Sequence, residues 1–157
     1  IVSNAVGQSV CACGRIQTGR FEYFVFGFLG RTDEARISAL IGRRVSSDPS
    51  VLCGAIGLGI NQKHNHAELG YWIGKPFWGN GYCTEAAQEV LRYGFEKLGL
   101  HRICASHFAH NPTSGRVMQK IGMTYEGCRR QHTLKWGEYI DVMEYGILKS
   151  EWQNLKN

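Results

Sequence analysis

Hydrophobic residues recur at three- and four-residue spacing in the stretch after Thr84, which is the pattern of an amphipathic helix. The apolar positions are Ala87, Val90, Leu91, Gly94, Phe95 and Leu98. Thr84 has the side chain of an N-cap, Glu85 suits a first turn, and Gly99 suits the C′ position. We therefore predict a helix from Thr84 to Leu98.

Short apolar runs bounded by turn residues predict strands. The runs are Phe21–Leu29, Val51–Ile60, Ala67–Ile73 and His101–His107. A short polar turn connects the second run to the third, which favours antiparallel pairing. The predicted helix connects the third run to the fourth, and a crossover that carries a helix favours parallel pairing.

Between the first two runs, the pattern predicts a helix that starts at an N-cap, Thr32. Asp33 and Glu34 would lie in its first turn, and Ile37, Leu40 and Ile41 share one helical face. Residues 46–50, SSDPS, have the composition of a loop. Residues 1–20 are the least informative part of the chain.

The C-terminal segment predicts a second helix and a hairpin. Asn111–Ile121 reads as a helix with Pro112 near N1 and Gly122 at its end. Met123–Leu134 and Glu138–Leu148 read as strands turned at Lys135-Trp136-Gly137. Together the elements predict an α/β fold, an α+β mixed sheet with flanking helices, in a single domain over residues 1–157.

Composition agrees with one ordinary globular domain. The 157 residues are 43% apolar and 20% charged, and no apolar run approaches the roughly 20 residues of a membrane span. The start, IVSNAVGQSVCACGR, has no basic leader ahead of its apolar residues, so we expect no signal peptide and a cytoplasmic location. The net charge of +5 favours an anionic partner, but the short basic pairs Arg43-Arg44 and Arg129-Arg130 do not form the stripe of a nucleic-acid groove.

Cysteine and histidine spacing predicts neither a disulfide framework nor a metal site. The six cysteines are Cys11, Cys13, Cys53, Cys83, Cys104 and Cys128, with no CxxC pair, so buried thiols are expected. A metal would recruit His64 and His66, or His107 and His110, yet no cysteine or carboxylate completes a ligand spacing.

A glycine-rich loop, Trp78-Gly79-Asn80-Gly81-Tyr82-Cys83, lies between the Ala67–Ile73 strand and the predicted helix. Glycines let main-chain N–H groups approach a ligand closely, and a helix N-terminus adds free donors and partial positive charge. This arrangement predicts a diphosphate site. Asn80-Gly81 is also the signal of a tight β-hairpin turn, but the helical spacing after it favours the loop.

Four motifs in order resemble the GNAT N-acetyltransferase superfamily. They are Glu68-Leu69-Gly70-Tyr71-Trp72-Ile73, Trp78–Ala86, Asn111-x-x-Ser114 with Lys120-Ile121-Gly122-Met123, and Trp136-Gly137-x-Tyr139-x-Asp141. The chain looks most like the branch that acetylates the N-terminal alanine of ribosomal proteins. The resemblance covers about residues 51–152. Residues 1–50 are atypical, because the family usually has a strand, two helices and a further strand there.

The resemblance implies a central, mostly antiparallel sheet whose fourth and fifth strands splay apart to admit acetyl-CoA. The family's (Gln/Arg)-x-x-Gly-x-(Gly/Ala) loop falls on Trp78–Cys83. Trp78 and Cys83 depart from it, but phosphate contacts come from main-chain donors. The implied cofactor-binding residues are Trp72, Ile73, Trp78, Gly79, Asn80, Gly81, Tyr82, Cys83, Thr84, Asn111 and Ser114. Trp78 as a core aromatic residue is the structural alternative.

By analogy with the family, a main-chain N–H of the strand that carries Trp72 and Ile73 stabilises the oxyanion. Glu68 is the candidate base, directly or through a water, and partial burial between Ala67 and Leu69 would strengthen it. Ser114 is the candidate acid for the leaving thiolate. Each residue also has an alternative role. Glu68 would be a solvated strand residue or a charge that anchors the amine, and Asn111 and Ser114 would be ordinary helix-start residues. Tyr139 and Asp141 would border the acceptor cleft or pack there.

These expectations describe an acetyl-CoA-dependent N-acetyltransferase without a metal, acting on a peptide N-terminus or a small amine such as a polyamine or antibiotic. No nucleic-acid or membrane partner is expected, and a monomer and a homodimer are both open. The competing interpretations are a catalytically silent acyl-CoA-binding module and a small basic nucleic-acid-binding protein.

Overall fold

The computed structural model describes residues 10–18, 21–29, 34–43 and 52–155. Eight strands form one sheet in the order β1-β2-β3-β4-β5-β6-β8-β7. The strands are β1 (Val10–Thr18), β2 (Phe21–Leu29), β3 (Glu34–Arg43), β4 (Leu52–Asn61), β5 (His66–Ile73), β6 (Arg102–Phe108), β7 (Thr124–Lys135) and β8 (Glu138–Leu148). Every neighbouring pair is antiparallel except β5 and β6, which are parallel. The predicted mixed, mostly antiparallel sheet is confirmed.

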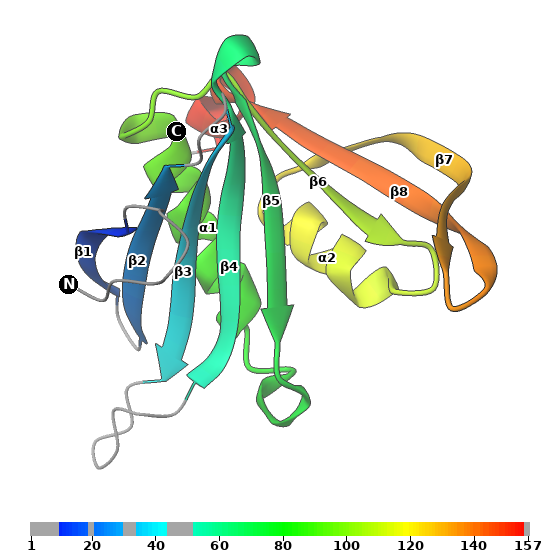
Figure 1. Cartoon of the computed structure of the whole chain (residues 1–157), viewed down its shortest axis with the longest axis horizontal. Coiled ribbons are helices and arrows are strands. Elements are labelled where there is room, and N and C mark those ends of the chain that lie inside the picture. The colour runs from blue at the N-terminus through cyan, green and yellow to red at the C-terminus, as the bar shows by residue number, and fades with distance from the viewer. Residues whose placement is uncertain (1–9, 19–20, 30–33, 44–51, 156–157) are drawn as a thin grey trace.

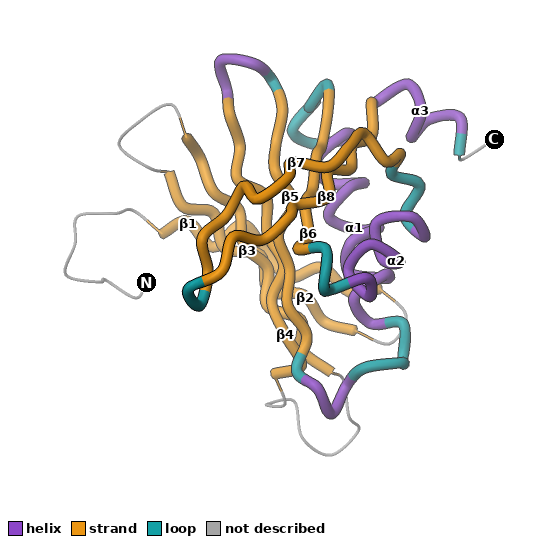
Figure 2. The backbone as a smooth tube through the Cα atoms, turned by 90° about the vertical axis from the view of Figure 1, so that its right-hand side faces the viewer, coloured by secondary structure: helices purple, strands orange, loops and turns teal. Residues whose placement is uncertain are grey.

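Three α-helices lie on one side of this sheet (Figure 2). They are α1 (Tyr82–Glu96), α2 (Pro112–Lys120) and α3 (Lys149–Asn154), and two short 3₁₀ turns, η1 (Gln62–His64) and η2 (Lys75–Phe77), flank β5. Among the described helices, none is long and apolar enough to cross a membrane.

The core lies between the helices and the sheet, because each contributes an apolar face. Leu91 and Phe95 of α1, Met118 of α2, and Leu58 and Ile103 of the sheet are all almost completely buried. The Phe95 and Trp152 rings pack at 5.2 Å between centroids, which joins α1 to α3. Burial of each large side chain contributes about 1.5–3 kcal/mol.

The predicted helix after Thr32 is wrong. Residues 34–43 form β3, which pairs antiparallel with β2 on one side and with β4 on the other. Two full ladders satisfy the main chain of this segment, and this outweighs a helical spacing that rests on Ile37, Leu40 and Ile41 alone. Thr32 itself lies outside the described residues, as does Val51 at the start of the predicted second strand.

The other predicted elements are confirmed, with small changes at their ends. The Thr84 N-cap is wrong, because α1 begins two residues earlier with Gly81 as its N-cap. Gly99 adopts a φ of 67° just after α1, as expected for a left-handed residue past a helix. At the hairpin tip, Trp136 and Gly137 have φ values of 55° and 83°, as a type I′ turn requires.

Strands β5 and β6 separate soon after they begin, as Figure 1 shows. Their parallel register joins His66 to Arg102, and it ends two pairs later at Glu68 and Cys104. We call the space between the two strands beyond this last pair the splay. The predicted splay is therefore present, but it lies between the fifth and sixth strands of the chain, because three strands precede β4 where the family pattern has two.

Candidate active site

The glycine loop between β5 and α1 has an open main chain. Gly79 and Gly81 adopt φ values of 78° and 80°, a region that residues with a side chain rarely occupy. A Cβ atom at either position would meet no protein atom within 4 Å. Gly81 is the N-cap of α1, so the tight hairpin considered for Asn80-Gly81 does not form. The loop thus presents bare main chain directly ahead of a helix.

Side chains within the loop hold its shape. The Trp78 Nε1–H donates to the Ile73 carbonyl at 2.8 Å, and the Asn80 Nδ2–H group donates to the carbonyls of Phe77 and Trp78 at 3.2 and 3.1 Å. The Trp78 side chain is 59% exposed, so its interpretation as a core aromatic residue is wrong. These hydrogen bonds hold the main chain between β5 and α1 in one conformation.

The first turn of α1 offers main-chain donors to an anion. Its first intrahelical bond runs from Glu85 N–H to the Gly81 carbonyl at 3.0 Å, so the amides of Cys83 and Thr84 precede the intrahelical ladder. Gly81 has no side chain to cap them. Burial raises the pKa of the Cys83 thiol to about 12, so this side chain is neutral at pH 7. The loop Trp78–Cys83 carries no anionic side chain, and the acidic residue of the first turn of α1 is Glu85.

Main-chain groups of β5 point alternately toward β4 and toward β6. The Gly74 N–H donates to the Cys53 carbonyl at 2.8 Å, one pair beyond the regular β4–β5 register. Because bonded and non-bonded pairs alternate along an antiparallel ladder, Trp72 bonds to β4, while Tyr71 and Ile73 turn their N–H groups toward β6. The Ile73 carbonyl also points away from β4, because it accepts a hydrogen bond from the Trp78 indole N–H. Two amides of β5 therefore face the splay.

Glu68 lies at the closed end of the splay, where it pairs in register with Cys104. Its side chain is exposed, whereas Ala67 and Leu69 are buried on the opposite face of the strand. The expected partial burial between these neighbours is therefore wrong, because successive side chains of a strand point to opposite faces. Within the described part of the chain, Glu68 makes no ion pair, so its carboxylate is available to an incoming amine.

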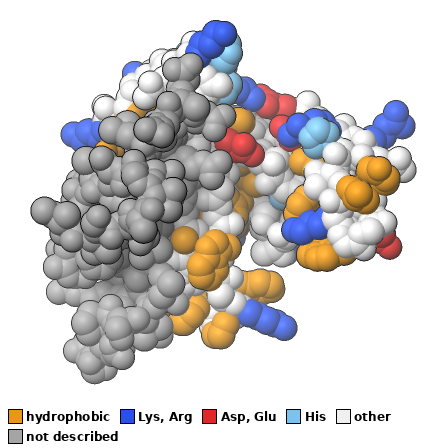
Figure 3. Space-filling view, viewed as in Figure 1, with side chains coloured by type: hydrophobic (Ala, Val, Ile, Leu, Met, Phe, Trp, Pro, Cys, Tyr) orange, Lys and Arg blue, Asp and Glu red, His pale blue; other side chains and the backbone are white. Residues whose placement is uncertain are grey.

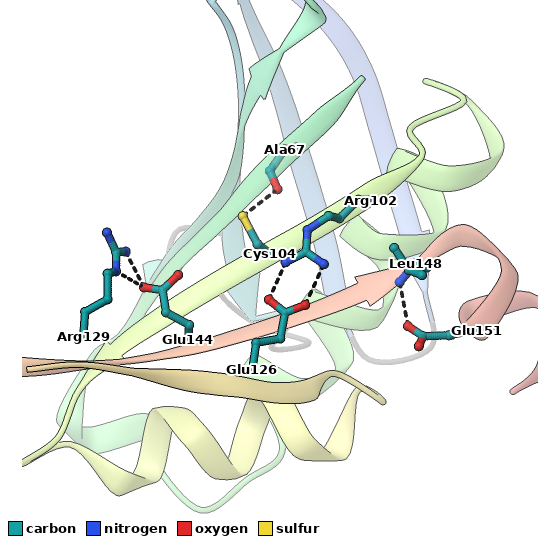
Figure 4. Close-up of polar contacts among 8 residues, drawn as sticks. All are labelled: Ala67, Arg102, Cys104, Glu126, Arg129, Glu144, Leu148 and Glu151. Carbon is teal, nitrogen blue, oxygen red and sulfur yellow. Dashed lines mark hydrogen bonds and ion pairs between the residues drawn. The ribbon is translucent and has the colours of Figure 1, made fainter. Parts of the chain in front are cut away.

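Two ion pairs flank Cys104, the register partner of Glu68, as Figure 4 shows. Arg102 binds Glu126 with both guanidinium nitrogens, one contact being 2.6 Å, and lowers the pKa of Glu126. Arg129 binds Glu144, with its Nε atom at 2.9 Å. Between them the Cys104 Sγ–H donates to the Ala67 carbonyl at 3.5 Å, and burial, with the nearby charge of Glu68, raises the pKa of that thiol.

Asn111 and Ser114 meet at the start of α2, across the splay from β5. The Asn111 Oδ1 atom accepts from the Ser114 N–H at 3.4 Å, and the Asn111 Nδ2–H donates to Ser114 Oγ at 3.0 Å. Because Ser114 Oγ already accepts from Asn111, its own O–H is left to donate elsewhere. The Ser114 side chain also lies within hydrogen-bonding reach of the Tyr71 hydroxyl.

Comparisons with known proteins identify the family of this chain. Residues 26–124 match the family model of the acetyltransferase (GNAT) domain, which covers more than half of the chain. The chain belongs to the GNAT acetyltransferase family. Its match to the family model begins within β2, so it includes part of the N-terminal region that looked atypical in the sequence.

Three relatives illustrate the range of this family. The chain is 41% identical over 103 residues to the uncharacterized N-acetyltransferase YoaA of Bacillus subtilis, covering 65% of this chain and 58% of the relative. It is 31% identical over 84 residues to the ribosomal protein uS5-alanine N-acetyltransferase of Escherichia coli, covering 54% and 43%. It superimposes with a TM-score of 0.70 and 26% identity on the spermidine/spermine N-acetyltransferase SpeG of Vibrio cholerae, in mutant form, covering 81% and 74%. The chain spans about half the length of the curated relatives.

The structure separates the predicted site residues of this GNAT domain into two places. The loop residues, Glu68, Asn111 and Ser114 lie along or beside the splay, whereas Tyr139 and Asp141 lie on the hairpin. Tyr139 is 65% exposed, and Asp141 Oδ1 accepts the N–H of Gln131 at 2.7 Å, which supports a β7 residue with a φ of 48°. Arg130, Gln131 and Asp141 line an open cavity of about 600 Å³. Asp141 therefore supports the β7 main chain at Gln131 and also lines this cavity.

Tyr71 and Glu144 are site neighbours that the sequence analysis missed. Tyr71 is the residue after Gly70 in the first family motif, and its hydroxyl donates to the Ser114 carbonyl at 2.9 Å. The side-chain alternation along β5 places Tyr71 on the helix side of the strand, which was the available signal. Glu144 pairs in register with Ser106 of β6, and no local motif marks it.

Figure 3 shows the face that carries the open end of the splay. Exposed apolar side chains gather around the lower end of β5 and the loop after it, where Trp72 and Trp78 are 56% and 59% exposed. Charged side chains mark the lobe of β7 and β8. The site therefore has an apolar region near the loop and a charged region near Glu68.

Proposed function

We propose that this domain transfers an acetyl group from acetyl-CoA to a primary amine by direct attack in a ternary complex. The observation that carries the proposal is the course of the chain from β5 through the bare main chain of Gly79 and Gly81 into the uncapped start of α1. A diphosphate suits these donors, and the attached pantetheine arm suits the splay beside them. The residues present therefore fit the substrate that the family uses.

The splay supplies groups for each step of acyl transfer. The neutral amine attacks the thioester carbonyl, and the Tyr71 or Ile73 N–H donates to the developing oxyanion. Glu68 takes the proton from the attacking nitrogen, directly or through a water. Ser114 donates its hydroxyl proton to the leaving thiolate, and Asn111 keeps that hydroxyl oriented as a donor.

An exposed carboxylate is a weak base, and this bears on the acceptor. An α-amine with a pKa near 7.7–8.0 is roughly a tenth neutral or more at pH 7, whereas a lysine near 10.4 is neutral in fewer than about one molecule in a thousand. Because Glu68 is exposed, the geometry favours an acceptor that needs little deprotonation. We therefore place a peptide N-terminal amine first, and a relative that acetylates a ribosomal protein's alanine is consistent with this choice.

A small polyamine is the second candidate acceptor. Its support is the similarity to a spermidine/spermine N-acetyltransferase and the carboxylate of Glu68, which makes no ion pair with a described residue and attracts a cation. A silent acyl-CoA-binding module would retain the loop and the splay but release no thiol.

Thiol release from acetyl-CoA tests these alternatives directly. The purified chain is mixed with peptides that differ only at the first residue, with the same peptides blocked at the N-terminus, and with spermidine. We expect release with a free α-amine and none with its blocked form. Release with spermidine alone would assign the small-amine function. Coenzyme A binding without release from any acceptor would indicate the binding module.

A further inference from the structure

We propose that Tyr71 is a positioning residue that sets the first turn of α2 across the splay and thereby places the Ser114 hydroxyl. The proposal rests on the proposed function for its catalytic meaning. Its structural basis is the hydrogen bond from the Tyr71 hydroxyl to the Ser114 main-chain carbonyl at 2.9 Å, which connects β5 to α2 over 43 residues of sequence.

The Tyr71–Ser114 hydrogen bond joins the two sides of the splay at a level where no sheet hydrogen bonds do. The register of β5 and β6 ends at Glu68 and Cys104, so no ladder joins the two strands at the level of Tyr71. Helix α2 follows β6 and packs on that side of the splay. A tie from β5 to the first turn of α2 therefore fixes the distance between the two sides at the position where the pantetheine arm would pass.

The Tyr71 side chain is well placed to hold this geometry. Its ring packs against the hydrophobic core, and burial is the main cause that raises the pKa of its phenol. The hydroxyl stays protonated at neutral pH and directs its proton to the Ser114 carbonyl. The ring is half-buried, which restricts the hydroxyl to few positions.

Tyr71 also connects the two helix starts that face the splay. The Cys83 thiol in the first turn of α1 is close enough to affect the ionisation of the Tyr71 hydroxyl. On the other side, the first turn of α2 carries Asn111 and Ser114, already joined to one another by two hydrogen bonds. Tyr71 therefore bonds to the turn that carries the candidate acid and lies within electrostatic range of the first turn of α1, whose amides form the proposed phosphate site.

Replacement by phenylalanine removes the tie and keeps the ring. A displacement of about 1 Å between reacting groups can cost on the order of 100-fold in rate. We expect Tyr71→Phe to lower kcat by about 10- to 100-fold, while KM for acetyl-CoA stays within about threefold. The matched control is Tyr145→Phe, which removes a hydroxyl that accepts from Gln119 at 3.4 Å, near the C-terminal end of α2 rather than its first turn. This control should retain wild-type kcat.

A double-mutant cycle with Ser114→Ala separates positioning from general destabilisation. If Tyr71 acts through Ser114, the double variant loses no more activity than Ser114→Ala alone. A kcat of Tyr71→Phe within twofold of wild type would overturn the proposal. So would a double variant whose loss equals the product of the two single losses, because Tyr71 would then act independently of Ser114.

Amide hydrogen exchange tests the tie without any activity. In Tyr71→Phe, the amides of the first two turns of α2 should exchange at least about tenfold faster than in wild type, and in Tyr145→Phe they should not. Exchange in Tyr71→Phe as slow as in wild type would show that the hydrogen bond does not hold α2. If wild-type protein transfers no acetyl group, the proposed function fails, and the exchange comparison alone decides whether Tyr71 sets this helix.

Discussion

Gly81 offers the sharpest test of the phosphate loop, because the same helix carries a matched control at its other end. Gly81 precedes α1 with a φ of 80°, and Gly99 follows it with a φ of 67°. At both positions a Cβ atom would meet no protein atom within 4 Å. Gly81→Ala and Gly99→Ala therefore impose a similar backbone strain, and only the first adds a methyl group to the proposed diphosphate site.

The expected magnitudes follow from that strain and from the donors. A left-handed main chain costs a residue with a side chain about 1–2 kcal/mol, so both variants should unfold at a temperature lower by about 2–8 °C. Loss of a hydrogen bond to a charged group costs about 1.5–3 kcal/mol, which corresponds to roughly 10- to 100-fold in affinity. We expect Gly81→Ala to weaken coenzyme A binding by that factor and Gly99→Ala to leave it unchanged.

Titration calorimetry with coenzyme A measures the affinities, and differential scanning calorimetry measures the unfolding temperatures. Acetyl-pantetheine, which lacks the diphosphate, serves as a second donor in the activity assay and should not distinguish the two variants. A coenzyme A affinity of Gly81→Ala equal to that of wild type would refute the assignment of this loop. An equal fall in both would mean that strain on α1, rather than contact with phosphate, controls binding.

Three further predictions test other parts of the account. Glu68→Gln should lower kcat by about tenfold or more and leave coenzyme A affinity unchanged, and an unchanged kcat would remove Glu68 from the base role. Gly54→Ala should destabilise the fold by more than about 3 kcal/mol in chemical denaturation, because its Cβ would lie 2.2 Å from a carbonyl oxygen of β5, whereas Gly70→Ala, with open space, should cost less than about 1 kcal/mol. Arg102 lowers the pKa of Glu126 from its ordinary 4.5, so their ion pair stabilises the fold above pH 4.5 and loses that effect as pH falls through the lowered pKa. Glu126→Gln should therefore reduce the loss of unfolding free energy at acid pH, by less than about 1 kcal/mol because the pair is partly exposed. An unchanged dependence of stability on acid pH would contradict this prediction.

Local signals in the sequence were sufficient for the fold from β4 onward. Helix α1 has a sustained apolar face, α2 starts at Asn111 with Pro112 after it, and the hairpin turn has glycine where φ is positive. Each of these features is decided by a few neighbouring residues. Helix α3 was missed because six residues are too short to show a periodic pattern.

The N-terminal strands were harder to predict because pairing decides them. In residues 34–43, Ile37, Leu40 and Ile41 fit one face of a helix, but Ala35, Ile37, Ala39 and Ile41 also alternate as in a strand. The helical pattern needs one apolar surface to pack on, whereas the strand pattern needs a paired strand on each side. The hydrogen-bonded ladders with β2 and β4 decide in favour of the strand. A sequence without an alignment does not reveal such pairing.

The candidate site shows the same division. The glycine loop and the α2 start are local in sequence and form where the motifs predicted them, while their roles toward acetyl-CoA stay predictions. The exposure of Glu68 and the tie between Tyr71 and Ser114 depend on which strand face meets a helix 43 residues away. These features depend on tertiary contacts, and motif spacing alone did not predict them.

A crystal structure of this chain with coenzyme A bound tests the central claim most directly. The account predicts a diphosphate on the main-chain amides at the start of α1, with the pantetheine arm between β5 and β6 and its sulfur near Ser114. A diphosphate bound elsewhere, for example at Arg129 and Arg130 on the hairpin, with the splay left empty, would contradict it.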